Sequence, residues 1–201
     1  MKWLIAIFLV CSLNIVCKAD IDTTTVAGKK VAEKMRILRS EKVTVMVCYY
    51  LKCSVDEKPL IADSCAGDDV TYLIWSDKGK SFIERFAGCK TYIAAPMSPV
   101  FLELIKKNYK VILKEKIWPP QFTHVEFNGR KLVYNEVAIG SCHTIFEMHL
   151  GNTNEVAGFN NFEMDTKYDN NKYLNRNYYR NQKTILCRLK KIVERKVATL
   201  N

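Results

Sequence analysis

The sequence lacks the short motifs that mark the most familiar enzyme sites. It contains no Gly-x-Ser-x-Gly nucleophile turn, no phosphate-binding P-loop and no glycine-rich dinucleotide turn. It also contains no Cys-x-x-Cys pair, which argues against a zinc or redox site, and no Asn-x-Ser/Thr acceptor for N-glycosylation. We therefore predict no independent active site, and we expect neither a cofactor nor a bound metal.

Long apolar runs are also scarce, and the single one lies at the N-terminus. Lys2 precedes an apolar run over residues 3–16, and small residues follow at the positions that a signal peptidase recognises. The run is shorter than the roughly 20 residues that cross a bilayer, and an uncleaved anchor is the alternative interpretation. The pattern predicts a signal peptide over residues 1–19 and a single secreted, extracellular domain over residues 20–201.

Six cysteines lie in the predicted secreted domain. An even number of cysteines in an exported chain predicts disulfides, here three, whose pairing the sequence leaves open. A zinc site is the competing interpretation, but export favours oxidation over metal binding. The residues predicted to form disulfides are Cys48, Cys53, Cys65, Cys89, Cys142 and Cys187.

The charge of the chain, +10 in total, is distributed unevenly. Residues 20–164 are almost neutral, with 19 basic and 18 acidic residues, whereas residues 165–201 hold 10 basic and 3 acidic residues. Positive charge concentrated at one end attracts polyanions or anionic lipid surfaces in a salt-dependent way. The alternative is a solvated basic helix that contributes only to solubility.

Alternation of apolar and polar residues predicts most of the strands. Asn128-Gly129 separates two alternating runs and predicts a hairpin with a tight two-residue turn. In the run that ends at Leu150, Phe146 and Met148 fall on the same face of the predicted strand as Leu150. Further period-two patterns, rich in β-branched and aromatic residues, occur over residues 43–51, 70–76, 81–86, 91–95 and 109–114.

Helical spacing predicts the remaining elements. We expect a helix over residues 26–39, a short helix that begins at Ser98-Pro99 and stops at Asn108, and an amphipathic C-terminal helix from Ile185. Cys187 is expected to tie the last helix to the sheet. Several strands with short turns and two or three peripheral helices predict an α+β fold with a mainly antiparallel sheet, stabilised by disulfides.

Two groups of residues have side chains that a metal ion could use. The polar loop over residues 54–69 is rich in acidic residues, but it lacks the spacing of a calcium-binding loop. His143, Glu147 and His149 fall on one face of a predicted strand, where they could hold a metal or perform acid/base chemistry. The two histidines would be about 20 Å apart along an extended strand, too far to share an ion. A solvated or partly buried strand face is the favoured interpretation.

The strongest functional candidate is the segment over residues 167–183. Its cations could contact phosphates, and its tyrosines could stack on bases, without choosing a sequence. The alternative is that the tyrosines pack under the C-terminal helix and the charges are only solvated. The residues predicted to bind nucleic acid are Lys167, Lys172, Arg176, Tyr179, Arg180 and Lys183.

A family resemblance supports this hypothesis. The run VAIGSCHTIFEMHL (137–150), followed by YLNRNYYRNQKTI (173–185), resembles a region of the secreted arthropod DNA/RNA non-specific endonucleases that lies upstream of their catalytic domain. That family uses an Asp-Arg-Gly-His motif and a downstream metal-holding Asn, and this sequence contains no Arg-Gly-His. The resemblance therefore implies a nuclease-like region to which no catalytic residue of the family can be assigned.

These observations lead to one functional prediction and two alternatives. The prediction is a secreted, nuclease-like, basic protein that binds the phosphate backbone of nucleic acid. The first alternative is a secreted binding or effector protein, of the kind found in saliva or venom, whose partner is a protein or a sulfated glycan. The second is a metal-dependent hydrolase, whose activity would disappear when Glu147 or His149 is replaced by Ala.

Overall fold

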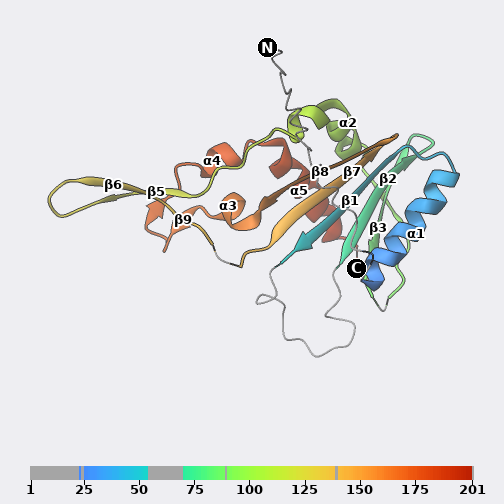
Figure 1. The fold of residues 1–201 in the computed structure, drawn as a ribbon, viewed down its shortest axis with the longest axis horizontal. Coiled ribbons are helices and arrows are strands. Elements are labelled where there is room, and N and C mark those ends of the chain that lie inside the picture. Colours follow the sequence, from blue (N-terminus) through green and yellow to red (C-terminus); the bar gives the residue numbers. More distant parts are fainter. Residues whose placement is uncertain (1–22, 24, 54–69, 89, 139, 201) are drawn as a thin grey trace, which may run out of the picture.

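The computed structural model describes residues 23, 25–53, 70–88, 90–138 and 140–200 (Figure 1). The predicted signal peptide and the acidic loop lie outside the described residues, and so do Cys65 and Cys89. Within the described part of the chain, no helix is long and apolar enough to cross a membrane.

The fold is α+β and is built on a six-stranded antiparallel sheet, as the sequence predicts. The strand order is β4-β3-β2-β1-β7-β8, so β1 and β2 lie at the centre. The four residues Met46 to Tyr49 of β1 are all buried, because helices cover both faces of the sheet. The strands are β1 Val45–Lys52, β2 Thr71–Asp77, β3 Lys80–Phe86, β4 Ala95–Met97, β7 His143–Leu150 and β8 Thr153–Asn160.

Helix α1 (Val26–Ser40) covers one face of the sheet. The side chain of Thr25 caps it by accepting a hydrogen bond from the Gly28 amide at 3.0 Å. The predicted apolar stripe is confirmed: Val31 and Met35 are buried against side chains of the two central strands. This face of the core contains Ala27, Val31, Met35, Leu38, Val43, Met46, Cys48, Leu73, Trp75 and Phe86.

Helices α2 (Val100–Ile112) and α5 (Ile185–Val197) cover the opposite face. Together with Phe146 and Met148 they form the larger part of the core, so the predicted inward face of β7 is confirmed. The buried residues of the two helices are Phe101, Leu102, Ile105, Ile112, Leu186, Cys187, Leu189 and Val193. The domain therefore has three layers, with α1 on one side of the sheet and α2 and α5 on the other (Figure 1).

Helix α2 is longer than predicted, and the strand expected over residues 109–114 does not form. The helix continues to Ile112 because Ile105 and Ile112 lie seven residues apart on the same buried face. Asn108, predicted as the stop, donates a hydrogen bond from its side chain to the Leu104 carbonyl at 2.8 Å. The strand predicted over residues 91–95 is also corrected: Thr91 forms an isolated bridge with Phe86, and the regular strand β4 begins only at Ala95.

The predicted hairpin forms, but with a different turn. Strands β5 (Gln121–Val125) and β6 (Lys131–Asn135) pair as a separate two-stranded sheet. The Glu126 amide donates to the Arg130 carbonyl at 2.8 Å, and the Gly129 amide donates to the Glu126 carbonyl at 2.9 Å. The loop therefore contains three residues, with Gly129 at φ 81°. Glycine is needed at this position because other residues rarely adopt a left-handed conformation.

Three elements follow β8 and lead to α5. They are the short helix α3 (Asn161–Asp165), a small hairpin of β9 (Tyr168–Asp169) and β10 (Tyr173–Leu174), and the short helix α4 (Tyr178–Asn181). Figure 1 shows that the β5–β6 hairpin projects away from the sheet and that these elements lie at its base.

The disulfide prediction is only partly correct. Cys53 at the end of β1 and Cys142 before β7 are bonded, which joins two strands that also pair along the sheet. Cys48 and Cys187 are free, buried thiols, contrary to the prediction, and Cys187 therefore does not tie α5 to the sheet by a covalent bond. Their side chains belong to the cores on opposite faces of the sheet. Burial raises the pKa of both thiols, which keeps them protonated.

Candidate nucleic-acid interface

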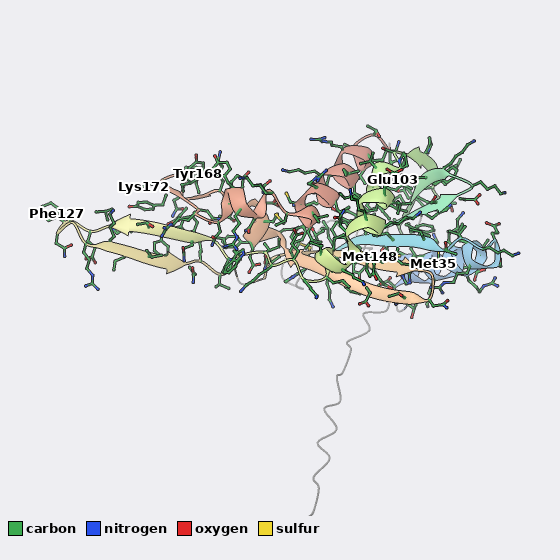
Figure 2. The ribbon with its side chains drawn as sticks, turned by 90° about the horizontal axis from the view of Figure 1, so that it is seen from above. Met35, Glu103, Phe127, Met148, Tyr168 and Lys172 are labelled. Atoms are coloured by element: carbon green, nitrogen blue, oxygen red, sulfur yellow. A yellow bond between two sulfur atoms is a disulfide. The ribbon has the colours of Figure 1, made fainter. Side chains whose placement is uncertain are left out.

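The residues predicted to bind nucleic acid lie outside the six-stranded sheet and α5. They belong to a part of the molecule that we call the side lobe, which consists of residues 115–138 and 161–184. Figure 2 shows Tyr168 and Lys172 on the β9–β10 hairpin, which lies beside the long β5–β6 hairpin, and Phe127 at the far tip of the latter. Two side-chain contacts join the hairpins: His124 with the Tyr173 hydroxyl at 2.6 Å, and the Tyr134 hydroxyl with Asp169 at 2.5 Å. The hydrogen bond to the Asp169 carboxylate raises the pKa of Tyr134 to about 12.

Two buried asparagines fix the two halves of the lobe to each other. Asn181 accepts a hydrogen bond from the Trp118 amide at 3.1 Å and donates to the Trp118 carbonyl at 2.8 Å and the Glu163 carbonyl at 3.0 Å. Asn175 accepts a hydrogen bond from the Gln121 amide at 3.0 Å. Both asparagines are fully buried, so they serve the fold of the lobe rather than a ligand.

A tight turn places the Lys172 side chain at the end of the β9–β10 hairpin. Asn170 and Asn171 both have positive φ values, 46° and 59°, and the Lys172 amide donates to the Asp169 carbonyl at 2.8 Å. Asparagine tolerates this left-handed backbone better than most residues, which explains the pair at this point. The Lys172 ammonium lies 5.2 Å from the centroid of the Tyr173 ring.

Helix α4 brings cations and aromatic rings together. The Arg180 guanidinium lies 4.1 Å from the centroid of the Trp118 ring, and the Lys116 ammonium lies 4.2 Å from the same centroid. Both distances are within the range of cation–π attraction. Trp118 and Lys116 were missed in the sequence, because they precede the basic segment by about fifty residues of chain and reach it only through the fold.

A second group of the same kind surrounds Lys167. Its ammonium lies 5.2 Å from the centroid of the Tyr168 ring, 5.7 Å from Tyr178 and 5.8 Å from Tyr179. The electrostatic interaction with Tyr168 raises the pKa of Lys167, followed by that with Tyr179, so the lysine stays charged. The structure therefore brings together Lys167, Tyr179 and Arg180 of the predicted set, through α4.

The other predicted residues are less closely grouped. Arg176 has an exposed side chain, and its amide donates to the Gln121 carbonyl at 2.8 Å. Lys183 is exposed directly after α4. Both leave their charges available to a ligand.

The C-terminal helix contributes less positive charge than its sequence indicates. Lys190 is buried and pairs with Asp165, and it lies 3.8 Å from Glu194. Lys191 donates a hydrogen bond to the side chain of Gln182 at 2.7 Å. Arg188 and Arg195 of α5 nevertheless stay exposed, so exposed positive charge lies both on the side lobe and on α5.

The histidines and glutamate predicted on one face of β7 do not form a shared site. The strand pairs continuously with β8 from His143 to Leu150, with no bulge to bring His143 toward His149. His143 is exposed, whereas Glu147 and His149 are buried and contact each other at 3.0 Å. Among the described residues, no group of three or more His, Cys, Asp or Glu side chains is arranged to hold a metal ion.

Comparison with known proteins found no relative. No family model matched the chain, and neither did any curated protein or solved structure.

Proposed function

We propose that this protein is secreted and binds nucleic acid without sequence preference through the cations and aromatic rings of the side lobe. The observation that carries the proposal is the arrangement around α4, where Arg180 contacts the Trp118 ring and Lys167 contacts three tyrosine rings. The Cys53–Cys142 disulfide supports the proposed export, because disulfides persist in oxidising compartments.

The same arrangement favours single strands over duplexes. Proteins that bind single-stranded nucleic acid combine a positive surface with rings on which unpaired bases stack. In the free protein the cations contact the aromatic rings. In the complex, the phosphates of a bound strand would contact the cations, and its bases would stack on the rings. Sequence choice is not expected, since backbone contacts carry no sequence information.

A protein partner is the second candidate, and one observation favours it. The β5–β6 hairpin exposes Phe127 at its tip and Val125 and Val133 along its length, and Val137 is exposed in the connection that follows β6. The opposite face of the hairpin is covered by the β9–β10 hairpin, through His124 and Tyr134. Exposed apolar side chains on a projecting hairpin are typical of a protein contact surface.

A binding titration separates the two candidates. The secreted chain from residue 20 onward is titrated with single-stranded DNA, duplex DNA and heparin at low and high salt, with magnesium present, and the DNA is checked for cleavage. For single-stranded DNA we expect the logarithm of the binding constant to fall with the logarithm of the salt concentration by about 0.7 per phosphate contact. Binding to a protein partner would depend much less on salt.

Matched variants locate the surface. Arg176→Ala with Arg180→Ala removes two cations from the lobe and should lower the salt slope by about 1.4. Lys78→Ala with Lys80→Ala removes the same charge at the exposed β2–β3 turn and should leave the slope unchanged. Tyr179→Ala should weaken binding by about 1–3 kcal/mol if a base stacks on the ring. The proposal fails if no DNA binds at low salt, or if both double variants weaken binding equally.

A further inference from the structure

A second polar site lies on the side of the sheet that α1 covers, away from the side lobe. Glu147 and His149 point to this side, because their partners across the β1–β7 register are Cys48 and Met46 of the α1 core. Glu147 is almost completely buried, and its Oε1 lies 3.0 Å from His149 Nε2. Among the described residues, neither the second oxygen, Oε2, nor His149 Nε2 has an aligned hydrogen-bond partner.

The burial of this carboxylate has a free-energy cost, because it removes the hydration of a polar group. An ion pair in the interior loses the hydration of both groups, and an apolar pair of the same size would stabilise the core as well or better. The adjacent Cys48 does not use the carboxylate as a base: burial raises the pKa of its thiol, the Glu147 charge raises it further, and its Sγ contacts Met35 Sδ at 3.7 Å. The partner of the Glu147 carboxylate is therefore His149 rather than Cys48.

His149 connects this buried carboxylate to an open cleft of about 480 Å³. The wall of the cleft comes from the end of α1, the following connection and the β7–β8 turn, with Arg39, Lys42, Thr44 and Asn154 among the lining residues. The Arg39 guanidinium lies 3.4 Å from His149 Nδ1. Nε2 of the imidazole thus contacts Glu147, and Nδ1 contacts Arg39 on the side of the cleft.

The cleft carries positive charge that described residues do not neutralise. Arg39 and Lys42 line it, no carboxylate does, and neither cation forms an ion pair with another described residue.

A second cleft of the same size shows the contrast. Between α1 and β3, Lys34 pairs with Glu84 at 3.1 Å, Lys30 donates to the Gly88 carbonyl at 2.8 Å, and Arg85 lies over the Tyr92 ring. In that cleft Lys30 and Lys34 have partners in the protein. In the Arg39 cleft, Arg39 contacts a ring nitrogen of His149, and neither Arg39 nor Lys42 pairs with a carboxylate of the described residues.

We propose that the Arg39 cleft binds a small ligand through a phosphate or sulfate group. The Arg39 guanidinium matches two oxygens of such a group, and Lys42 adds a second positive charge. His149 becomes doubly protonated on binding: Nδ1–H donates to the ligand while Nε2–H donates to Glu147, whose carboxylate neutralises the imidazolium. Binding therefore takes up one proton from solvent, and the affinity rises as the pH falls.

We expect anion binding to be coupled to protonation of His149, because charged groups surround it on the elements that pack against it. Arg39 approaches it from α1, and Lys42 of the α1–β1 connection lines the same cleft; both carry positive charge. Glu147 on the same strand carries the opposite charge, and Cys48 on β1 stays neutral. A bound anion offsets the two cations, so protonation and binding assist each other.

The test is an NMR titration of the isotope-labelled secreted chain with sodium sulfate, at a pH of about 6 and of about 8, on either side of the usual range for histidine. Sulfate keeps its charge over this interval, so a change in its affinity reports on the protein. We expect saturable shifts at the amides of the β7–β8 turn and at the His149 ring, with tighter binding at the lower pH. Glucose 6-phosphate and glucose 6-sulfate, titrated in parallel, distinguish a phosphate from a sulfate ligand.

Two arginines of α1 give a matched control. Arg39→Ala should abolish saturation, whereas Arg36→Ala, which removes an exposed cation whose partner is Glu33, should leave it intact. His149→Gln should remove the pH dependence. Shifts that never saturate, or that are lost equally in both arginine variants, would overturn the proposal. Arg39→Ala should leave DNA binding unchanged, so this site and the side lobe fail or succeed separately.

Discussion

The sheet body and the side lobe of this protein are stabilised in different ways. In the body, meaning the six-stranded sheet with α1, α2 and α5, buried apolar side chains fill both faces of the sheet. In the lobe, by contrast, the fully buried Asn175 and Asn181 bond to backbone groups of the opposite half, and apolar side chains such as Phe127 are exposed. The body is therefore stabilised by a packed apolar core, whereas the lobe is held in shape by hydrogen bonds between its two halves.

The difference teaches how a region with little apolar burial keeps its geometry. Apolar burial is strong but not directional, so it tolerates small shifts. Amide hydrogen bonds to backbone groups are directional, and each unsatisfied buried partner has a large cost. We expect that the lobe holds its rings and cations in register because the asparagines permit few alternatives.

The largest effect should come from a cavity in the body. Phe146 is fully buried and its ring lies 5.3 Å from that of Tyr49 and 6.4 Å from that of Phe101. Phe146→Ala should lower the free energy of unfolding by about 3–5 kcal/mol, measured by urea denaturation. A loss below about 1 kcal/mol would show that the body is not a close-packed core.

A second, more local effect should come from the lobe. Asn181→Ala leaves two backbone groups of Trp118 and the Glu163 carbonyl without their partner, at a cost of about 1–3 kcal/mol for each group that water does not reach. Hydrogen exchange should accelerate in the lobe and change little in the sheet. Asn152→Ala, at an exposed turn, is the control and should have no effect. Equal acceleration in the body and the lobe would mean that the two regions unfold as one unit.

The connection between the regions should give a smaller effect. The Glu115 carboxylate of the lobe accepts hydrogen bonds from the Ile185 and Leu186 amides, at 2.9 and 2.8 Å, at the N-terminus of α5. Glu115→Ala should destabilise the protein by about 0.5–2 kcal/mol, as the loss of a helix cap does. Glu115→Gln keeps one acceptor oxygen and should fall between Ala and the unchanged protein in thermal unfolding; a Gln variant as unstable as Ala would argue against capping.

The smallest effect should come from the tip of the hairpin. Phe127 is fully exposed, so Phe127→Ser should change the free energy of unfolding by less than about 0.5 kcal/mol. Salt-dependent DNA binding should also be unchanged, whereas capture of a protein partner would weaken. A loss of stability as large as that of Phe146→Ala would show that the hairpin packs against the body in solution.

Much of the body was predictable from local patterns. The strand alternation in β1, β2, β3 and β7 and the stripe of α1 appear in the sequence because each element buries one defined set of side chains. The extension of α2 to Ile112 was not predictable: residues 109–114 fit both periods, and burial of Ile112 against the body decides between them.

The structure of the lobe was less predictable, although some of its candidate binding residues could be identified in the sequence. The sequence identified Lys167, Tyr179 and Arg180 as a group because they lie close along the chain. It did not reveal Lys116 and Trp118, which reach Arg180 from the other half of the lobe, nor that Asn175 and Asn181 are structural. The pattern of a segment does not show which of its polar side chains will meet backbone groups far away in the chain.

By itself, the sequence determined the α+β class, most of the antiparallel elements and the concentration of positive charge after residue 164, because periodicity and composition are local properties. Only the tertiary structure decided which cysteines pair, which lysines remain exposed and which glutamate is buried. Cys48 and Cys187 lie in the cores on opposite faces of the sheet. Lys190 is buried and pairs with Asp165, and Glu147 is buried in contact with His149. These outcomes depend on contacts between distant segments, which exist only after the chain has folded.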